Sequence, residues 1–176
     1  GGNVRIYIPD RLVEGYGPNT PALIKLADDG AKVVITVDCG ISAFDPLAAA
    51  AEAGLDVIVV DHHEAEAALP TAHAVINPNR LDEDRTLGHL AAVGVAFLLV
   101  VATNRVLRTR GWFGDRAEPD LRQWLDIVAL GTVCDVVPLK GLNRAFVIQG
   151  LKVMARRGNP GLAALCDVAG IDRKPE

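Results

Sequence analysis

The chain has 176 residues, 50% of them apolar and 23% charged, with a formal net charge of −4, which is an ordinary globular composition with enough length for one domain with a core. Three cysteines at wide spacing argue against a disulfide framework and for a reducing cytoplasm, and the lack of a Cys-x-x-Cys pair argues against a thiolate zinc site. No secretory signal is visible at the start, and the longest apolar run, 90–103, is too short to span a bilayer, so we expect a buried helix there and no membrane contact.

The first sixty residues predict strands and helices in alternation. Strands are expected at 4–8, 33–37 and 56–60, and helices at 21–29 and 45–53. Thr20 and Asp45 are expected to cap the two helices. The second and third strands are continuous apolar runs, typical of strands buried on both faces. This alternation predicts an α/β fold, with a mainly parallel sheet and helices on both faces.

The rest of the chain is predicted to be mostly helical. A short strand is expected at 74–76, a polar loop at 79–86, and helices at 87–110, 120–130, 143–157 and 161–169. No repeat, low-complexity tract or linker is visible. We therefore expect a single domain over residues 1–176.

Charged or imidazole side chains follow two of the buried strands. Asp38 ends one strand, and Asp61, His62 and His63 end the next. Because sites in parallel sheets form outside the carboxyl ends of the strands, both groups should meet at one edge. Carboxylate and imidazole together suit Mn²⁺, Fe²⁺, Co²⁺ or Zn²⁺. The alternative is that Asp38 caps a turn and the histidines are surface residues.

A third acid lies in an otherwise apolar stretch. Asp135 stands within Gly131–Pro138, and a lone buried carboxylate needs a partner. A metal ion would serve. A helix cap or a salt bridge to an arginine would also satisfy it, and both alternatives stay open.

These motifs resemble the DHH phosphoesterases. Asp61-His62-His63 matches the signature that names the family, while residues 37–40 and 131–135 look like its second and fourth motifs, in the family's order. Residues 7–17, 93–97 and 137–144 resemble the RecJ-type exonucleases of that family in particular.

The resemblance implies a two-metal phosphodiesterase that uses Mn²⁺ or Mg²⁺. Asp38 would bridge both ions, and His62 and Asp135 would bind one of them. His63 would contact the scissile phosphate, and Asp61 would orient the histidine pair. An acid behind a histidine is a common device for fixing its tautomer.

The resemblance further implies 5′-to-3′ exonuclease action on single-stranded DNA, in DNA repair and recombination, with replication or repair proteins as partners of the parent protein. One alternative is a DHH hydrolase of small phosphates or short oligonucleotides. Another is a non-catalytic DHH scaffold domain. The oligomeric state is left open.

The first family motif, an Asp-x-Asp after the opening strand, is not recognisable. Asp82-Glu83-Asp84 has that spacing, but it lies in a polar loop and is expected to be solvated. We therefore expect a partial catalytic domain, without the first βα unit and the C-terminal domains of the parent, and weak or no nuclease activity from this segment alone.

Four residues are candidate DNA contacts. Arg11 could hold a phosphate, Tyr16 could stack on a base, and Asn143 and Arg144 begin a helix, where anions bind readily. Residues 101–176 also carry 12 basic and 8 acidic residues, against 6 and 14 in residues 1–100. The alternatives are a tight turn with a packing aromatic, a helix cap with a surface arginine, and solvated helix faces.

Overall fold

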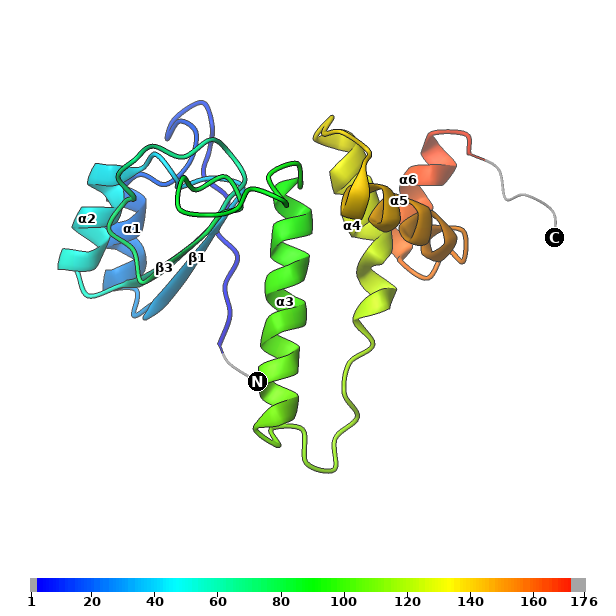
Figure 1. The fold of residues 1–176 in the computed structure, drawn as a ribbon. Coiled ribbons are helices and arrows are strands. Elements are labelled where there is room, and N and C mark those ends of the chain that lie inside the picture. Colours follow the sequence, from blue (N-terminus) through cyan, green and yellow to red (C-terminus); the bar gives the residue numbers. More distant parts are fainter. Residues whose placement is uncertain (1–2, 172–176) are drawn as a thin grey trace. The chain divides into compact units, whose positions relative to one another are not determined.

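A computed structural model describes residues 3–171, and the chain divides into two compact units between Gly88 and His89. We call residues 1–88 unit 1 and residues 89–176 unit 2, and describe each by itself. Unit 1 holds the sheet, and the described part of unit 2 is helical (Figure 1). The sequence patterns gave no sign of this division, because no linker composition marks the boundary.

Unit 1 is built on a three-stranded parallel sheet in the order β1-β2-β3. The strands are β1 (Val33–Val37), β2 (Asp56–Val60) and β3 (Ala74–Ile76). The register places Val37 beside Val60, and Val60 in turn beside Ile76, so all three strands end at the same level. The predicted α/β class with a parallel sheet is confirmed.

Helices α1 (Thr20–Asp28) and α2 (Phe44–Glu52) pack on one face of this sheet (Figure 1). The core there joins Leu23 of α1, Leu47 of α2 and Val57 and Val59 of β2. On the opposite face, β1 leaves alternate side chains about half exposed, with Ile35 at 54%. The expectation that β1 is buried on both faces is wrong, because the described helices of unit 1 cover only one.

The predicted strand at 4–8 is not a strand. The segment pairs with none of the strands among residues 3–171, and Val4, Ile6 and Ile8 are all more than 80% exposed. Alternating β-branched residues favour an extended backbone, but a strand also needs a neighbour to accept its hydrogen bonds.

Both predicted helix caps differ by one or two positions. The N-cap of α1 is Asn19, not Thr20, and its side chain accepts a hydrogen bond from the amide of Ala22. Helix α2 has Ala43 as its N-cap, with no side-chain cap. Asp45 lies inside the first turn instead, where its negative charge stabilises the helix by interacting with the positive end of the helix dipole.

Unit 2 contains four α-helices and one 3₁₀ turn in its described part. They are α3 (Ala92–Thr109), η1 (Leu121–Trp124), α4 (Leu125–Cys134), α5 (Gly141–Met154) and α6 (Pro160–Val168). Helices α4 and α5 cross closely at Gly150, where a Cβ would lie 2.1 Å from the carbonyl oxygen of Leu125. The predicted helices are present, with ends shifted by up to five residues.

Helix α3 is less buried than its sequence suggested. Only 22% of the helix is buried, and Val95 and Asn104 are among its buried residues. Its 18 residues are long and apolar enough to cross a membrane by length and composition alone. The core helix of a water-soluble protein meets the same criterion, so this single helix does not assign the chain to a membrane.

Candidate metal centre

The carboxyl ends of the three strands bring the site residues together. The amide of Asp38 donates to the carbonyl of Val60 at 2.9 Å, and the amide of Asp61 donates to that of Ile76 at 3.0 Å. These two bonds continue the sheet ladder one residue beyond each strand. The motifs that follow β1 and β2 therefore begin side by side, as the sequence predicted.

Asp38, His62 and His63 form a cluster of possible metal ligands. One ligand atom from each lies within 4.8 Å of the others. His62 Nε2 is 3.3 Å from Asp38 Oδ1, and the His62 side chain is only 14% exposed. One carboxylate and two imidazoles at this spacing have the donor chemistry that Mn²⁺ and related ions accept.

Asp38 has a left-handed backbone conformation, with φ of 62°. Aspartate tolerates this region better than most residues, because its short polar side chain bonds locally. The Tyr16 hydroxyl donates to the Asp38 carbonyl at 2.5 Å, which fixes the turn from the opposite side. Burial first, and then the negative charges of Asp38 and Asp61, raise the pKa of Tyr16, so its hydroxyl keeps its proton.

Asp61 is 1% exposed and organises the histidine loop. Its Oδ2 accepts from the amide of Ile41 at 3.0 Å, and its Oδ1 accepts from the amides of His62 and His63. The same Oδ1 lies 2.6 Å from His63 Nδ1. Burial opposes ionisation, but these hydrogen bonds outweigh it and lower the pKa of Asp61. The carboxylate is thus ionised and holds the His63 ring by its Nδ1 atom.

The loop before α1 carries Arg11 and Tyr16 towards the cluster. The Arg11 guanidinium lies 5.3 Å from the Tyr16 ring centroid, and that ring meets His63 edge-on at 6.4 Å. Glu14 holds the loop together, because it accepts from the Tyr7 hydroxyl and from the Asp10 amide. The two predicted DNA contacts of unit 1 therefore lie beside the candidate ligands.

Cys39 follows Asp38 directly, yet it is a poor ligand candidate. Burial raises the pKa of its thiol, and Asp61 and Asp38 raise it further. The sulfur donates to the carbonyl of Val37 at 3.5 Å. At neutral pH the group is a protonated thiol, which leaves oxygen and nitrogen donors to define the site.

The predicted site residues of unit 2 have different surroundings from those expected. Asp135 is exposed at the C-terminal end of α4, so the expectation of a buried acid is wrong; the apolar residues around it mark the helix, not a core. Asn143 is fully buried and donates to the carbonyls of His89 and Pro138, so it is a structural residue and not a surface DNA contact. Arg144 is exposed.

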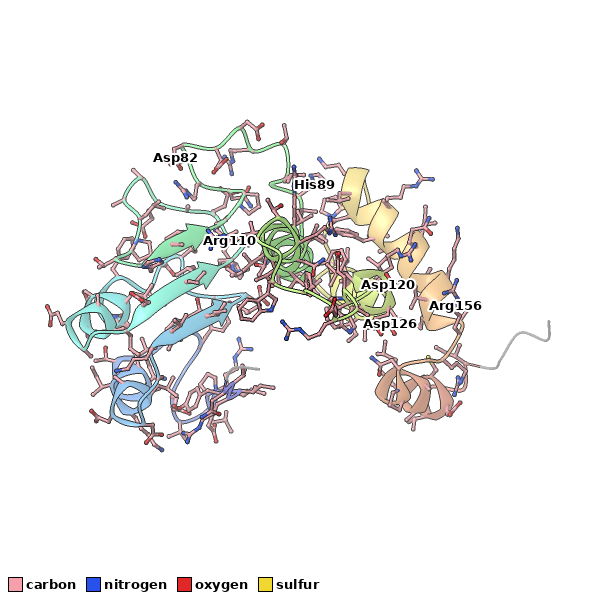
Figure 2. All side chains as sticks on the ribbon, turned by 90° about the horizontal axis from the view of Figure 1, so that it is seen from below. Asp82, His89, Arg110, Asp120, Asp126 and Arg156 are labelled. Atoms are coloured by element: carbon pink, nitrogen blue, oxygen red, sulfur yellow. The ribbon has the colours of Figure 1, made fainter. Side chains whose placement is uncertain are left out.

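Other charged residues behave as surface groups. Asp82, labelled in Figure 2, pairs with Arg80 and is 63% exposed, in agreement with a solvated loop. A hollow of about 820 Å³ in unit 2 lies among η1, α4, α5 and the start of α6. It mixes both signs of charge, from Arg122, Lys152, Arg156, Asp120 and Asp126. The basic surplus of residues 101–176 does not form a uniform basic face there.

Sequence reasoning missed two buried residues beside the histidines. Asn77 and Asn79 are 4% and 7% exposed, and their amides bond to the main chain of His63 and His62. The available signal was a pair of asparagines around Pro78, directly after a strand. A turn explains that pattern equally well, so the sequence alone did not distinguish the two.

The sequence of the chain is similar to a known protein family and to several curated proteins. The model of the DHH family, N-terminal domain, matches residues 1–132. The single-stranded-DNA-specific exonuclease RecJ of Dickeya dadantii is 43% identical over 175 residues, which cover 98% of this chain and 30% of that protein. The protein of that name from Escherichia coli is 43% identical over 173 residues, which cover 97% of this chain and 30% of that protein.

Solved structures match as well. The crystal structure of exonuclease RecJ bound to manganese superposes with a TM-score of 0.79 and 34% identity, over 96% of this chain and 40% of that one. The structure of RecJ from Thermus thermophilus in complex with Mn²⁺ superposes with a TM-score of 0.69 and 32% identity. The match covers 86% of this chain and 22% of that one. The chain spans about a third of the length of the curated relatives it matches.

Proposed function

The chain belongs to the DHH family, and from that premise we propose that it hydrolyses phosphodiester bonds of single-stranded DNA with the help of divalent metal ions. The observation that carries the proposal is the meeting of Asp38, His62 and His63 at the ends of adjacent parallel strands. Relatives named as single-stranded-DNA-specific exonucleases match nearly the whole chain, which supports this substrate over small phosphates or a scaffold role.

The metal ions would be held by Asp38, as a bridge, and by His62 and Asp135. The oxygen and nitrogen donors of the first two suit Mn²⁺, and the related crystal structures with manganese support this choice over Mg²⁺, which prefers oxygen ligands. When bound, such ions acidify a water molecule and neutralise charge on the phosphate. The proposal for Asp135 rests on its motif.

The chain's own residues would place the substrate. Asp61 accepts from His63 Nδ1, and the imidazolium form of His63 has a second N–H at Nε2 that would donate to the scissile phosphate. Arg11 has a planar guanidinium that pairs bidentately with a phosphate, and Tyr16 offers an exposed ring face for a base. Arg144 is a further phosphate contact.

The family resemblance extends the proposal to direction and setting. Digestion would start at the 5′ end, and the work would belong to DNA repair and recombination in the cytoplasm, with replication or repair proteins as partners. Cleavage of short oligonucleotides without cleavage of long single strands would instead favour the small-substrate alternative.

The test uses the natural protein that carries this chain, with Asp38→Ala, His63→Ala and the surface control Glu66→Ala. Hydrolysis of a 5′-phosphorylated single strand and of a blunt duplex is followed with Mn²⁺, and Mn²⁺ affinity is measured by calorimetry. Because His63 contacts phosphate in this proposal, His63→Ala should slow cleavage at least about a hundredfold and leave Mn²⁺ binding nearly intact. Asp38→Ala should lose both.

Each outcome bears on a different part of the proposal. Equal loss of Mn²⁺ affinity in the two variants would make His63 a ligand and remove its phosphate role. Cleavage that survives Asp38→Ala would place the site elsewhere. Faster digestion of the duplex than of the single strand would contradict the proposed substrate.

A further inference from the structure

Two buried asparagines follow β3 and reach the loop that follows β2. Asn77 comes directly after the strand, and Asn79 stands two residues further on. They are 4% and 7% exposed. Because neighbouring parallel strands end at one edge, both side chains lie beside His62 and His63 without being near them in sequence.

The amide groups of these asparagines bond to the main chain around them. Asn77 Nδ2 donates to the carbonyl of His63 at 2.9 Å, while its Oδ1 accepts from the amide of Asn79 at 2.8 Å. Asn79 Nδ2 donates to the carbonyls of His62 at 2.6 Å and of Gly88 at 3.0 Å. Both hydrogens of Asn79 Nδ2 thus have acceptors, which a carboxylate of the same shape could not satisfy.

The main-chain N–H groups of the same two histidines are held by Asp61. Its carboxylate accepts from the amides of His62 and His63, and the asparagines donate to their carbonyls. All four main-chain polar groups of the histidine pair therefore bond to buried side chains. A loop that only needed satisfied carbonyls could use water, because the His63 side chain is half exposed.

Space around Asn79 is tightly closed. A Cβ on Gly88 would lie 2.3 Å from Asn79 Oδ1, so the chain approaches the amide where only glycine fits. Arg85 also lies 3.4 Å from that oxygen and pairs with Glu64, which follows the histidines. The asparagine is fixed from several sides and cannot move away from the His62 carbonyl.

We infer that Asn77 and Asn79 are positioning residues, which fix the main chain of His62 and His63 and so aim the imidazole of His62 at the metal and that of His63 at the phosphate. The inference rests on the metal site proposed above. Burying an amide is unfavourable unless its polar atoms have partners, and each of these two amides has a histidine carbonyl as one of its partners. Strand β3 serves the site by delivering these amides.

The test is a set of isosteric variants. Asn77→Asp and Asn79→Asp keep the shape but remove the donors. Asn104→Asp is the matched control, because Asn104 is also 7% exposed and lies in unit 2. Two measurements are made on each: ¹⁵N spectra of the imidazoles without metal, and Mn²⁺ affinity by calorimetry. Melting temperatures report any general loss of stability.

We expect the His63 ring, held by Asp61, to show one tautomer in the wild type and in Asn104→Asp, and averaged tautomers in the other two variants. Mn²⁺ affinity should fall about 10- to 100-fold in Asn79→Asp, the usual effect of losing an outer partner of a ligand, because Asn79 holds the main chain of the proposed ligand His62. Asn77→Asp should leave Mn²⁺ affinity nearly unchanged, because Asn77 holds His63, the proposed phosphate contact. Unchanged spectra and unchanged affinity in folded variants would overturn the inference.

Two further outcomes are also decisive. If the aspartate variants do not fold, Asn77→Ala and Asn79→Ala take their place, and failure of all four while Asn104→Asp folds would make the asparagines structural and overturn the inference. If the wild type binds no Mn²⁺, the proposed metal site fails, and the imidazole spectra still decide whether the asparagines order the rings.

Discussion

Tyr16 carries two groups that could serve the site in different ways. Its hydroxyl donates to the carbonyl of Asp38, and the residue is 61% exposed, with its ring beside Arg11. The hydrogen bond would stabilise the left-handed backbone of the proposed ligand Asp38, and the ring would stack on a base. Single-atom and whole-ring substitutions separate these roles.

We predict that Tyr16→Phe weakens Mn²⁺ binding about fivefold, the value of one hydrogen bond of about 1 kcal/mol, and leaves the KM for single-stranded DNA unchanged. Tyr16→Ala should also raise KM at least about fivefold, because stacking contributes about 1–3 kcal/mol per base. Calorimetry and steady-state kinetics give the two values. A KM that rises equally in both variants would mean that the ring does not stack.

Glu14 makes the loop that carries Arg11 and Tyr16 sensitive to acid. Hydrogen bonds from the Tyr7 hydroxyl and then from the Asp10 amide lower the pKa of Glu14 below its ordinary value of about 4.3. A lowered pKa stabilises the folded loop at all pH above the ordinary value, and this contribution is lost as pH falls through the folded value.

We therefore predict that the amide proton of Asp10 shifts in NMR spectra with a midpoint below about pH 4.3. Glu14→Gln should remove this transition, since glutamine does not ionise. A midpoint at or above the ordinary value in the wild type would contradict the hydrogen bonds assigned to Glu14.

Residue types predicted the chemistry of the site better than its surroundings. Asp38 and the histidines could be found because each follows a buried strand, and strand ends converge in a parallel sheet. Asn77 could not, because its role depends on which neighbouring loop its amide reaches. Asn143 was misjudged for the same reason, since a helix start gives no sign of which side chains of its first turn are buried.

At the scale of elements, the α4–α5 crossing is the closest helix contact in the described part of unit 2. A Cβ at Gly150 would lie 2.4 Å from Ala129 Cβ as well as 2.1 Å from the Leu125 carbonyl oxygen. Glycine is unfavourable inside a helix by about 1 kcal/mol, so its presence there reflects the crossing.

We predict that Gly150→Ala lowers the free energy of unfolding by about 1–3 kcal/mol, because overpacking outweighs the gain in helix propensity. Urea unfolding measures this change. Gly158→Ala is the control, since no atom lies within 4 Å of its Cβ position. Equal stability of Gly150→Ala and the wild type would show that the helices can separate without loss.

Elements whose own residues show one clear pattern of apolar side chains were predicted well. Elements whose pairing or burial depends on neighbouring segments were not. Strand β2 is a continuous apolar run and is where the sequence placed it. The segment at 4–8 has the right residue types but no partner among the described strands. Strand β1 has an equally apolar sequence, yet one of its faces is half exposed, which its own residues do not reveal.

At the scale of the whole molecule, the DHH match extends over parts of both units. It covers residues 1–132, so it continues past the boundary at Gly88 and ends before Asp135. Asp38 and the histidines belong to unit 1, and Asp135 belongs to unit 2. The proposed ligand role of Asp135 therefore needs its own test.

We predict that Asp135→Asn reduces Mn²⁺ affinity at least about tenfold. Loss of a residue that only supports a ligand usually costs about 10- to 100-fold, so loss of a ligand itself should cost no less. Asp115→Asn, an exposed acid of the same unit, should have no effect. Calorimetric titration compares them. Matching affinities in the two variants would remove Asp135 from the ligand set.

The histidine loop also determines how an anion can be held. Many phosphate sites rely on main-chain N–H groups that point into a glycine-rich turn. Here the amides of Ile41, His62 and His63 all donate to the Asp61 carboxylate, so none of these three is left for a substrate. In the proposed function a phosphate at this edge would therefore be held by metal ions and by side chains such as that of Arg11, which would make phosphate binding depend on bound metal.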